Sequence, residues 1–148
     1  ALEVFHKLED FEARDLAKLL RAFSAARMEA RKLFEKAALE ALKKIETFEP
    51  KDFADTAWAY ANAGVEAPLL FEAVAAETLK NIDLYEPHDL ANVAWALSKA
   101  PCPAPVGLRD LFEKIAEEAP NRVDALTPVD LANIVWAIAK AGVAAPLL

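Results

Sequence analysis

Apolar residues recur at helical spacing along most of the chain. In the segment 126–142 they form one broad side of a helix, with a narrow polar stripe opposite, at about 100° per residue. The broad side consists of Leu131, Ala132, Ile134, Val135, Trp136, Ile138 and Ala139. A side this wide suits a helix with neighbours on three sides, as in a stack of helical repeats.

This segment, called helix A below, occurs four times. Its copies occupy residues 11–27, 48–64, 85–100 and 126–142. The last three place Trp58, Trp95 and Trp136 in register at spacings of 37 and 41 residues, and the first has Arg21 instead. A second helical segment, helix B, follows at 33–48, 70–85 and 111–126. The pattern predicts an all-α fold, a right-handed α-solenoid of two-helix repeats of about 37–41 residues.

One helical-repeat array is expected to fill residues 1–148. We divide it into the end of a preceding repeat (1–10), three repeats (11–47, 48–84 and 85–125) and a truncated repeat (126–148). Prolines at 50, 87 and 128 are expected to begin helix A, while Gly64 and Gly142 are expected to end it. The array is expected to extend beyond this sequence.

The polar stripe of helix A is the most informative surface feature of the sequence. In the last repeat it consists of Asp130, Asn133, Ala137 and Lys140, and equivalent residues recur in each copy. The bordering column, Arg14, Lys51, His88 and Val129, varies most in chemistry. Stacked repeats would align these residues, so the pattern predicts an open contact surface along helix A.

Charge and composition restrict the function. A formal net charge of -7 argues against a general polyanion binder. The segment from Arg14 to Lys44 is nevertheless basic, with nine Lys or Arg and only four Asp or Glu. Cys102 is the single cysteine, which excludes an intrachain disulfide and favours a reducing compartment. His6 and His88 lack neighbours at metal-ligand spacing. We therefore expect no enzyme, no metal and no cofactor.

The helix A segments DLANVAWALSKA and DLANIVWAIAKAG, with a period near 38, resemble octotricopeptide repeats. These repeats are related to those found beside RAP domains in organelles. The resemblance implies an RNA-binding factor of the chloroplast or mitochondrion that acts in organellar RNA metabolism or ribosome assembly.

The leading hypothesis is that single-stranded RNA, ribosomal RNA included, binds along the helix A surface. Its candidate residues are Arg14, Lys18, Arg21, Lys51, Asp55, Asn62, His88, Asn92, Lys99, Asn133 and Lys140. The alternative is a protein–protein interaction scaffold or structural subunit of a large organellar complex. Neither hypothesis includes membrane insertion or a small-molecule substrate.

Each candidate residue also has a structural interpretation. The tryptophans could stack on bases or pack between repeats. Asn92 and Asn133 could read base edges or form hydrogen bonds between stacked helices, and the lysines could contact phosphate or only water. Asp52, Asp89 and Asp130 lie at the third helical position, where capping and the helix dipole account for them.

Overall fold

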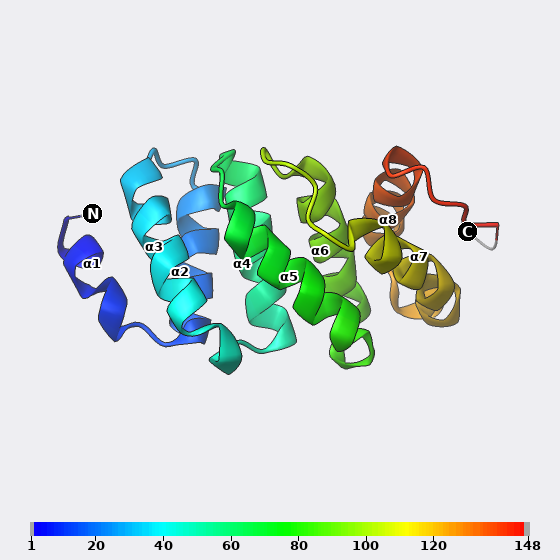
Figure 1. Cartoon of the computed structure of the whole chain (residues 1–148), viewed down its shortest axis with the longest axis horizontal. Helices are drawn as coiled ribbons and strands as arrows, with labels where there is room; N and C mark the ends of the chain where they lie inside the picture. Colours follow the sequence, from blue (N-terminus) through cyan, green and yellow to red (C-terminus); the bar gives the residue numbers. More distant parts are fainter. Residues whose placement is uncertain (1, 147–148) are drawn as a thin grey trace.

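The computed structural model describes residues 2–146, which form α-helices and short 3-10 helices and, within that range, no strand (Figure 1). The α-helices are α1 (Leu2–Lys7), α2 (Ala13–Ala25), α3 (Arg31–Lys43), α4 (Pro50–Ala63), α5 (Pro68–Lys80), α6 (Pro87–Lys99), α7 (Leu108–Glu118) and α8 (Pro128–Lys140). The 3-10 helices are η1 (Leu8–Asp10), η2 (Ile45–Thr47), η3 (Ile82–Leu84) and η4 (Ala119–Ala125). The predicted all-α fold is confirmed.

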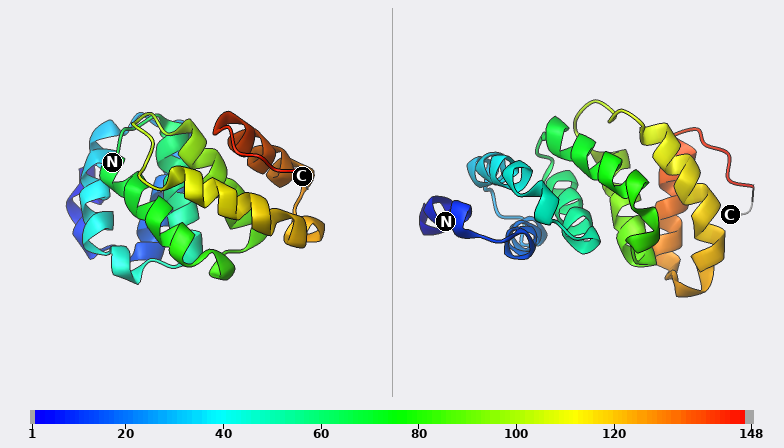
Figure 2. Two further views of the ribbon diagram at one scale, coloured as in Figure 1. Left: turned by 45° about the vertical axis from the view of Figure 1, so that its right-hand side comes forward. Right: turned by 60° about the horizontal axis from the view of Figure 1, so that its bottom comes forward.

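The helices form two layers that run in parallel along the molecule. The copies of helix A are α2, α4, α6 and α8, and each packs most extensively against the next copy. The copies of helix B, α3, α5 and α7, lie along one side of this row (Figures 1 and 2). Every helix among the described residues is too short or too polar to cross a membrane.

The helix ends follow the predicted signals. Proline occupies the first turn of α4, α6 and α8, where its missing N–H leaves no hydrogen bond unmade. Gly64 ends α4 in the left-handed conformation, with φ of 66°. The proline-rich segment after α6 is a loop, and burial raises the pKa of the Cys102 thiol within it.

Aromatic side chains fill the space between the two layers. Phe34 of α3 meets Tyr60 of α4 edge-on, with ring centroids 5.0 Å apart. The Tyr60 hydroxyl donates a 2.6 Å hydrogen bond to the Phe34 carbonyl, and burial raises the Tyr60 pKa. Phe71 and Phe112 are buried at corresponding places in the next repeats. Each helix B thus contributes a buried phenylalanine to the core.

Alanines form the contacts within the helix A row. Ala59, Ala96 and Ala137 are fully buried, and so are Ala54 and Ala94. The expectation of an open alanine at the centre of the stripe is therefore wrong for α4, α6 and α8. An alanine lets two helix backbones approach closely, so this column faces the neighbouring helix A, whereas Ala22 of α2 and the lysines of the stripe are exposed.

This packing predicts that Ala96→Leu destabilises the protein by about 1–3 kcal/mol, because the added methylene groups have no space in the row. The free energy of unfolding in urea measures the effect. Ala76→Leu, at an exposed position of α5, is the matched control and should change stability little. Equal stability of both variants would show that the row is loosely packed.

Candidate functional site

The surface that the row does expose, called the helix A face below, shares two of its four columns with the predicted stripe, and its other two columns lie one residue before those predicted. It consists of four columns: Arg14, Lys51, His88, Val129; Lys18, Asp55, Asn92, Asn133; Arg21, Trp58, Trp95, Trp136; and Ala25, Asn62, Lys99, Lys140. All eleven candidate residues lie in these columns. The sequence pattern therefore located the residues on one face, but it missed that the tryptophan column belongs to the same face.

The columns differ in exposure. The first and last columns are exposed to solvent, whereas Asp55 and Asn92 of the second are buried. Trp58 and Trp95 are half-buried. The face thus has charged margins and a partly covered floor.

Ion pairs connect α2 to α4 across this face. Arg21 Nη1 lies 2.9 Å from Asp55 Oδ1, and Lys51 Nζ lies 3.2 Å from the second oxygen of the same carboxylate. Arg14 pairs with Glu49 at 3.1 Å, although both side chains are well exposed. Asp55 is therefore neutralised from two helices, which identifies it as a structural residue as well as a candidate contact.

A second set of contacts connects α6 to α8. His88 Nδ1 lies 2.7 Å from Asp130 Oδ1, and the Asn92 amide lies 3.3 Å from the other ring nitrogen of His88. Lys140 of α8 donates to the Ser98 carbonyl of α6. Asn92 thus pairs with a histidine of its own helix and not with another asparagine.

The tryptophan column forms a partial stack. The rings of Trp58 and Trp95 are 6.1 Å apart at an interplanar angle of 29°, and the Arg21 guanidinium lies 4.3 Å from the Trp58 ring centroid. Trp136 is instead 41% exposed, with two lysines over its ring. The column combines the two interpretations of the tryptophans, because it packs between repeats and also reaches the surface.

The charge of the helix A face is opposite to that of the whole chain. Its columns hold six Lys or Arg against one Asp, whereas the chain carries a formal charge of -7. The acidic residues that set the overall sign therefore lie mainly elsewhere. A negative net charge does not exclude a polyanion from this particular surface.

Two equivalent aspartates of the row have opposite pKa shifts. Burial raises the pKa of Asp89. Burial acts on Asp130 in the same direction, but hydrogen bonds from Thr127 and His88 outweigh it and lower the Asp130 pKa. Thr127 also completes a capping box with Asp130 at the start of α8. The hydrogen bonds from Thr127 and His88 together therefore favour the charged form of Asp130.

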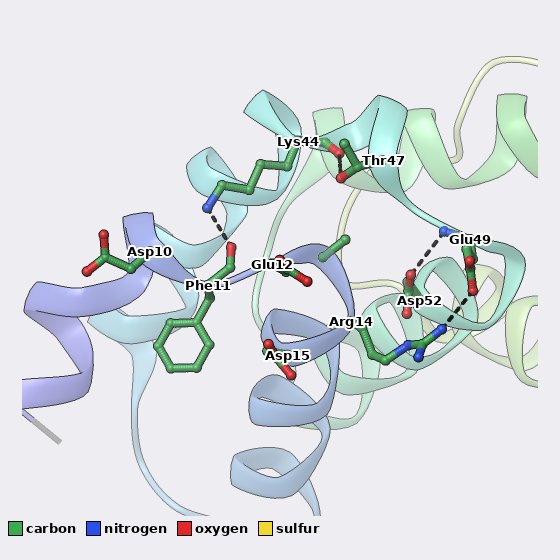
Figure 3. Close-up of a pocket in the computed structure, with 10 residues that line it drawn as sticks. Asp10, Phe11, Glu12, Arg14, Asp15, Lys44, Thr47, Glu49 and Asp52 are labelled. Atoms are coloured by element: carbon green, nitrogen blue, oxygen red, sulfur yellow. Dashed lines mark hydrogen bonds and ion pairs between the residues drawn. The ribbon is translucent and has the colours of Figure 1, made fainter.

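Two cavities lie beside the first turns of α2 and α4. One of about 610 Å³ is lined by Asp10, Phe11, Glu12, Ala13, Arg14, Asp15, Lys44, Thr47, Glu49 and Asp52 (Figure 3). The other, of about 260 Å³, lies on the helix A face and is lined by Arg14, Lys18, Glu49, Lys51, Asp52 and Asp55. Sequence reasoning missed both, since their walls come from different repeats. Within residues 2–146, no three His, Cys, Asp or Glu side chains could together hold a metal ion.

The chain matches the family model RESC6, described as RNA-editing substrate-binding complex 6 protein, over residues 4–145. No curated protein matches it significantly. The resemblance to octotricopeptide repeats is therefore wrong as a family assignment. Most residues of its motif are small or apolar and serve the close packing of stacked helices, so the motif does not distinguish one repeat family from another.

We expect the Trp58–Trp95 contact to stabilise the row by about 0.5–1.5 kcal/mol beyond the burial of each ring. A double-mutant cycle with Trp58→Ala and Trp95→Ala, followed by urea unfolding, measures this coupling. The control cycle uses Trp58→Ala and Trp136→Ala, which lie on helices separated by α6. The changes in unfolding free energy of these two variants should add within about 0.5 kcal/mol. Additivity in both cycles would mean that the stack contributes nothing of its own.

The two aspartates predict opposite pH dependence. The lowered pKa of Asp130 gives stability that is present above its unfolded pKa and lost as the pH falls through its folded pKa. The cost of Asp130→Asn should therefore be largest near neutral pH and shrink below about pH 4. The raised pKa of Asp89 gives stability that is present in acid and lost as the pH rises, so the cost of Asp89→Asn should shrink toward neutral pH. Unfolding free energies from pH 3 to 7 test both slopes, and slopes of the same sign would contradict the assignment.

Proposed function

The chain belongs to the RNA-editing substrate-binding complex 6 protein family, and on that premise we propose that it is a structural subunit of an RNA-editing substrate-binding complex. The family match carries this proposal, because it extends through all four copies of helix A. The fold supports it: a row of helices with a continuous core presents long, rigid surfaces on which several proteins can dock. We assign no catalytic step to the chain.

An organellar location is part of the proposal. The proposed organelle is the mitochondrion and not the chloroplast, because the RNA-editing machinery of this family is mitochondrial. A role in ribosome assembly has no support and is not proposed. The single half-buried cysteine fits a reducing compartment.

Direct RNA contact along the helix A face is a second candidate function. The six-to-one excess of basic over acidic residues in the four columns supports it, since phosphate neutralisation supplies most of the affinity of such surfaces. Lys18 and Lys99 are exposed to solvent on the face. Arg14, Arg21 and Lys51 are already ion-paired, so RNA would have to compete for them.

The experiment is purification of the full-length tagged protein from its own cells, with and without RNase. We expect partner subunits to remain bound after RNase treatment, because a scaffold holds them through protein contacts. Loss of all partners with the RNA would contradict the scaffold proposal.

The RNA candidate is tested in the same purification. The triple variant Lys18→Ala, Lys51→Ala, Lys99→Ala should keep its partners but bind RNA more weakly, with a flatter salt dependence. Its matched control removes one exposed lysine from each helix B: Lys32, Lys80 and Lys114. Equal RNA retention by both triple variants would eliminate the helix A face as the RNA contact.

A further inference from the structure

Arg27 has a backbone conformation in which the corresponding residues of other repeats are glycine. It follows α2 with φ of 53° and is the one residue other than glycine with a positive φ within residues 2–146. The corresponding residues after α4 and α8 are Gly64 and Gly142, with φ of 66° and 67°. A side chain disfavours this region of backbone conformation, so stability alone would select glycine here. Arg27 is therefore a candidate for a function that needs its side chain.

The Arg27 side chain projects away from the packed helices. A Cβ atom added at Gly64, which has a complete repeat on either side, would meet no atom within 4 Å. A side chain in this turn thus reaches open space even in a fully packed part of the array. The exposure of Arg27 is therefore a property of the turn, whichever repeats lie beside it.

Arg27 lines a cavity of about 500 Å³ between two repeats. One wall comes from the end of α2, the following turn and the start of α3, and the other wall comes from the end of α4 (Figure 1). Arg31, in the first turn of α3, is a second lining cation, and Glu29 is the only acid among the lining residues. Asn62 of α4 also lines the cavity and belongs to the last column of the helix A face. The cavity therefore adjoins that face.

The cavity has more hydrogen-bond donors than the chain pairs. Among the described residues, neither Arg27 nor Arg31 forms an ion pair. Ser24 also lines the cavity and is 4% exposed. Its hydroxyl accepts a 2.8 Å hydrogen bond from the Asn62 amide and, within residues 2–146, donates none. Two guanidinium groups and a buried hydroxyl proton therefore remain for an acceptor with negative charge.

We propose that Arg27 and Arg31 bind a phosphate group of single-stranded RNA at this cavity, an inference that rests on RNA contact as part of the proposed function. A guanidinium presents two parallel N–H groups to two oxygens of one phosphate, which an ammonium group cannot do. The Ser24 hydroxyl supplies a further donor from the cavity wall.

The surroundings of the cavity favour RNA over an acidic protein segment. Positive charge continues from the two arginines along the helix A face, which holds six Lys or Arg against one Asp. A polyanion needs such an extended row of cations, whereas a single acidic side chain does not. The next repeat has Gly64 and Pro68 in place of the two arginines, so the site is specific to the junction between α2, α3 and α4.

The test gives the first turn the residues of the second. In the full-length protein, the double variant Arg27→Gly, Arg31→Pro should keep or raise the Tm, because glycine suits a positive φ and proline suits the first helical turn. Its affinity for a fluorescein-labelled 12-nucleotide oligouridylate, read by anisotropy, should fall roughly 3- to 30-fold, with a flatter salt dependence. Arg27→Gly alone should show part of this loss, and it keeps the inference testable if the proline disturbs α3.

Two controls separate phosphate contact from other effects. A second probe has the same length and charge but abasic sites, and it should lose as much affinity for the variant, because the arginines contact phosphate and not bases. The double variant Lys80→Ala, Lys114→Ala removes two exposed positive charges from helices B and should bind like the parent. An equal loss in this lysine variant would mean that only total charge matters, which would overturn the site.

Failure of this inference can be told apart from failure of the proposed function. If the triple variant Lys18→Ala, Lys51→Ala, Lys99→Ala loses RNA while the arginine variant binds like the parent, the inference is wrong and RNA contact on the helix A face stands. Parent protein that binds neither probe but keeps its partners after RNase treatment would overturn the inference and the RNA candidate, but not the scaffold proposal. An arginine variant that loses a protein partner and keeps its RNA affinity would assign the arginines to a protein interface, and the inference would again be wrong.

Discussion

Close approach of consecutive helices A is the constraint on which this structure depends. Alanines with no exposed surface, such as Ala59, Ala96 and Ala137, let α2, α4, α6 and α8 pack directly against one another. Within the part of the chain that the structure describes, α4 and α6 then have a helix A on both sides and a helix B behind them. One narrow face remains for solvent, and every candidate contact residue lies on that face.

The helix A face is used in two ways. Its cations connect successive repeats, as Arg21 does with Asp55 and His88 with Asp130 when protonated. The same groups give the face a positive charge on an acidic protein. A surface of this kind holds the row rigid, which a scaffold requires, and presents positive charge to a passing polyanion. The scaffold and RNA interpretations therefore describe different properties of one surface and do not exclude each other.

The correction of the family assignment follows from the same packing. The segments that resembled octotricopeptide repeats contain the alanines, tryptophan and apolar residues by which each helix A packs against its neighbours. Such positions reflect how the helices stack, whereas the family match depends on the sequence as a whole between residues 4 and 145. A helical-repeat motif therefore predicts the architecture better than the lineage.

The sequence by itself determined the helices, their order and their capping, because helical periodicity, proline at the first turn and glycine at φ of 66° act over a few neighbouring residues. It also placed all eleven candidate residues on one face. Only the tertiary structure decided which stripe is buried. Neighbouring residues lie about 100° apart around a helix, and the packing of the row decides that the column of Ala59, Ala96 and Ala137 is buried while Lys99 and Lys140 stay exposed. The pairing of Arg21 with Asp55 and the stacking of Trp58 on Trp95 also depend on contacts between repeats, which no local pattern specifies.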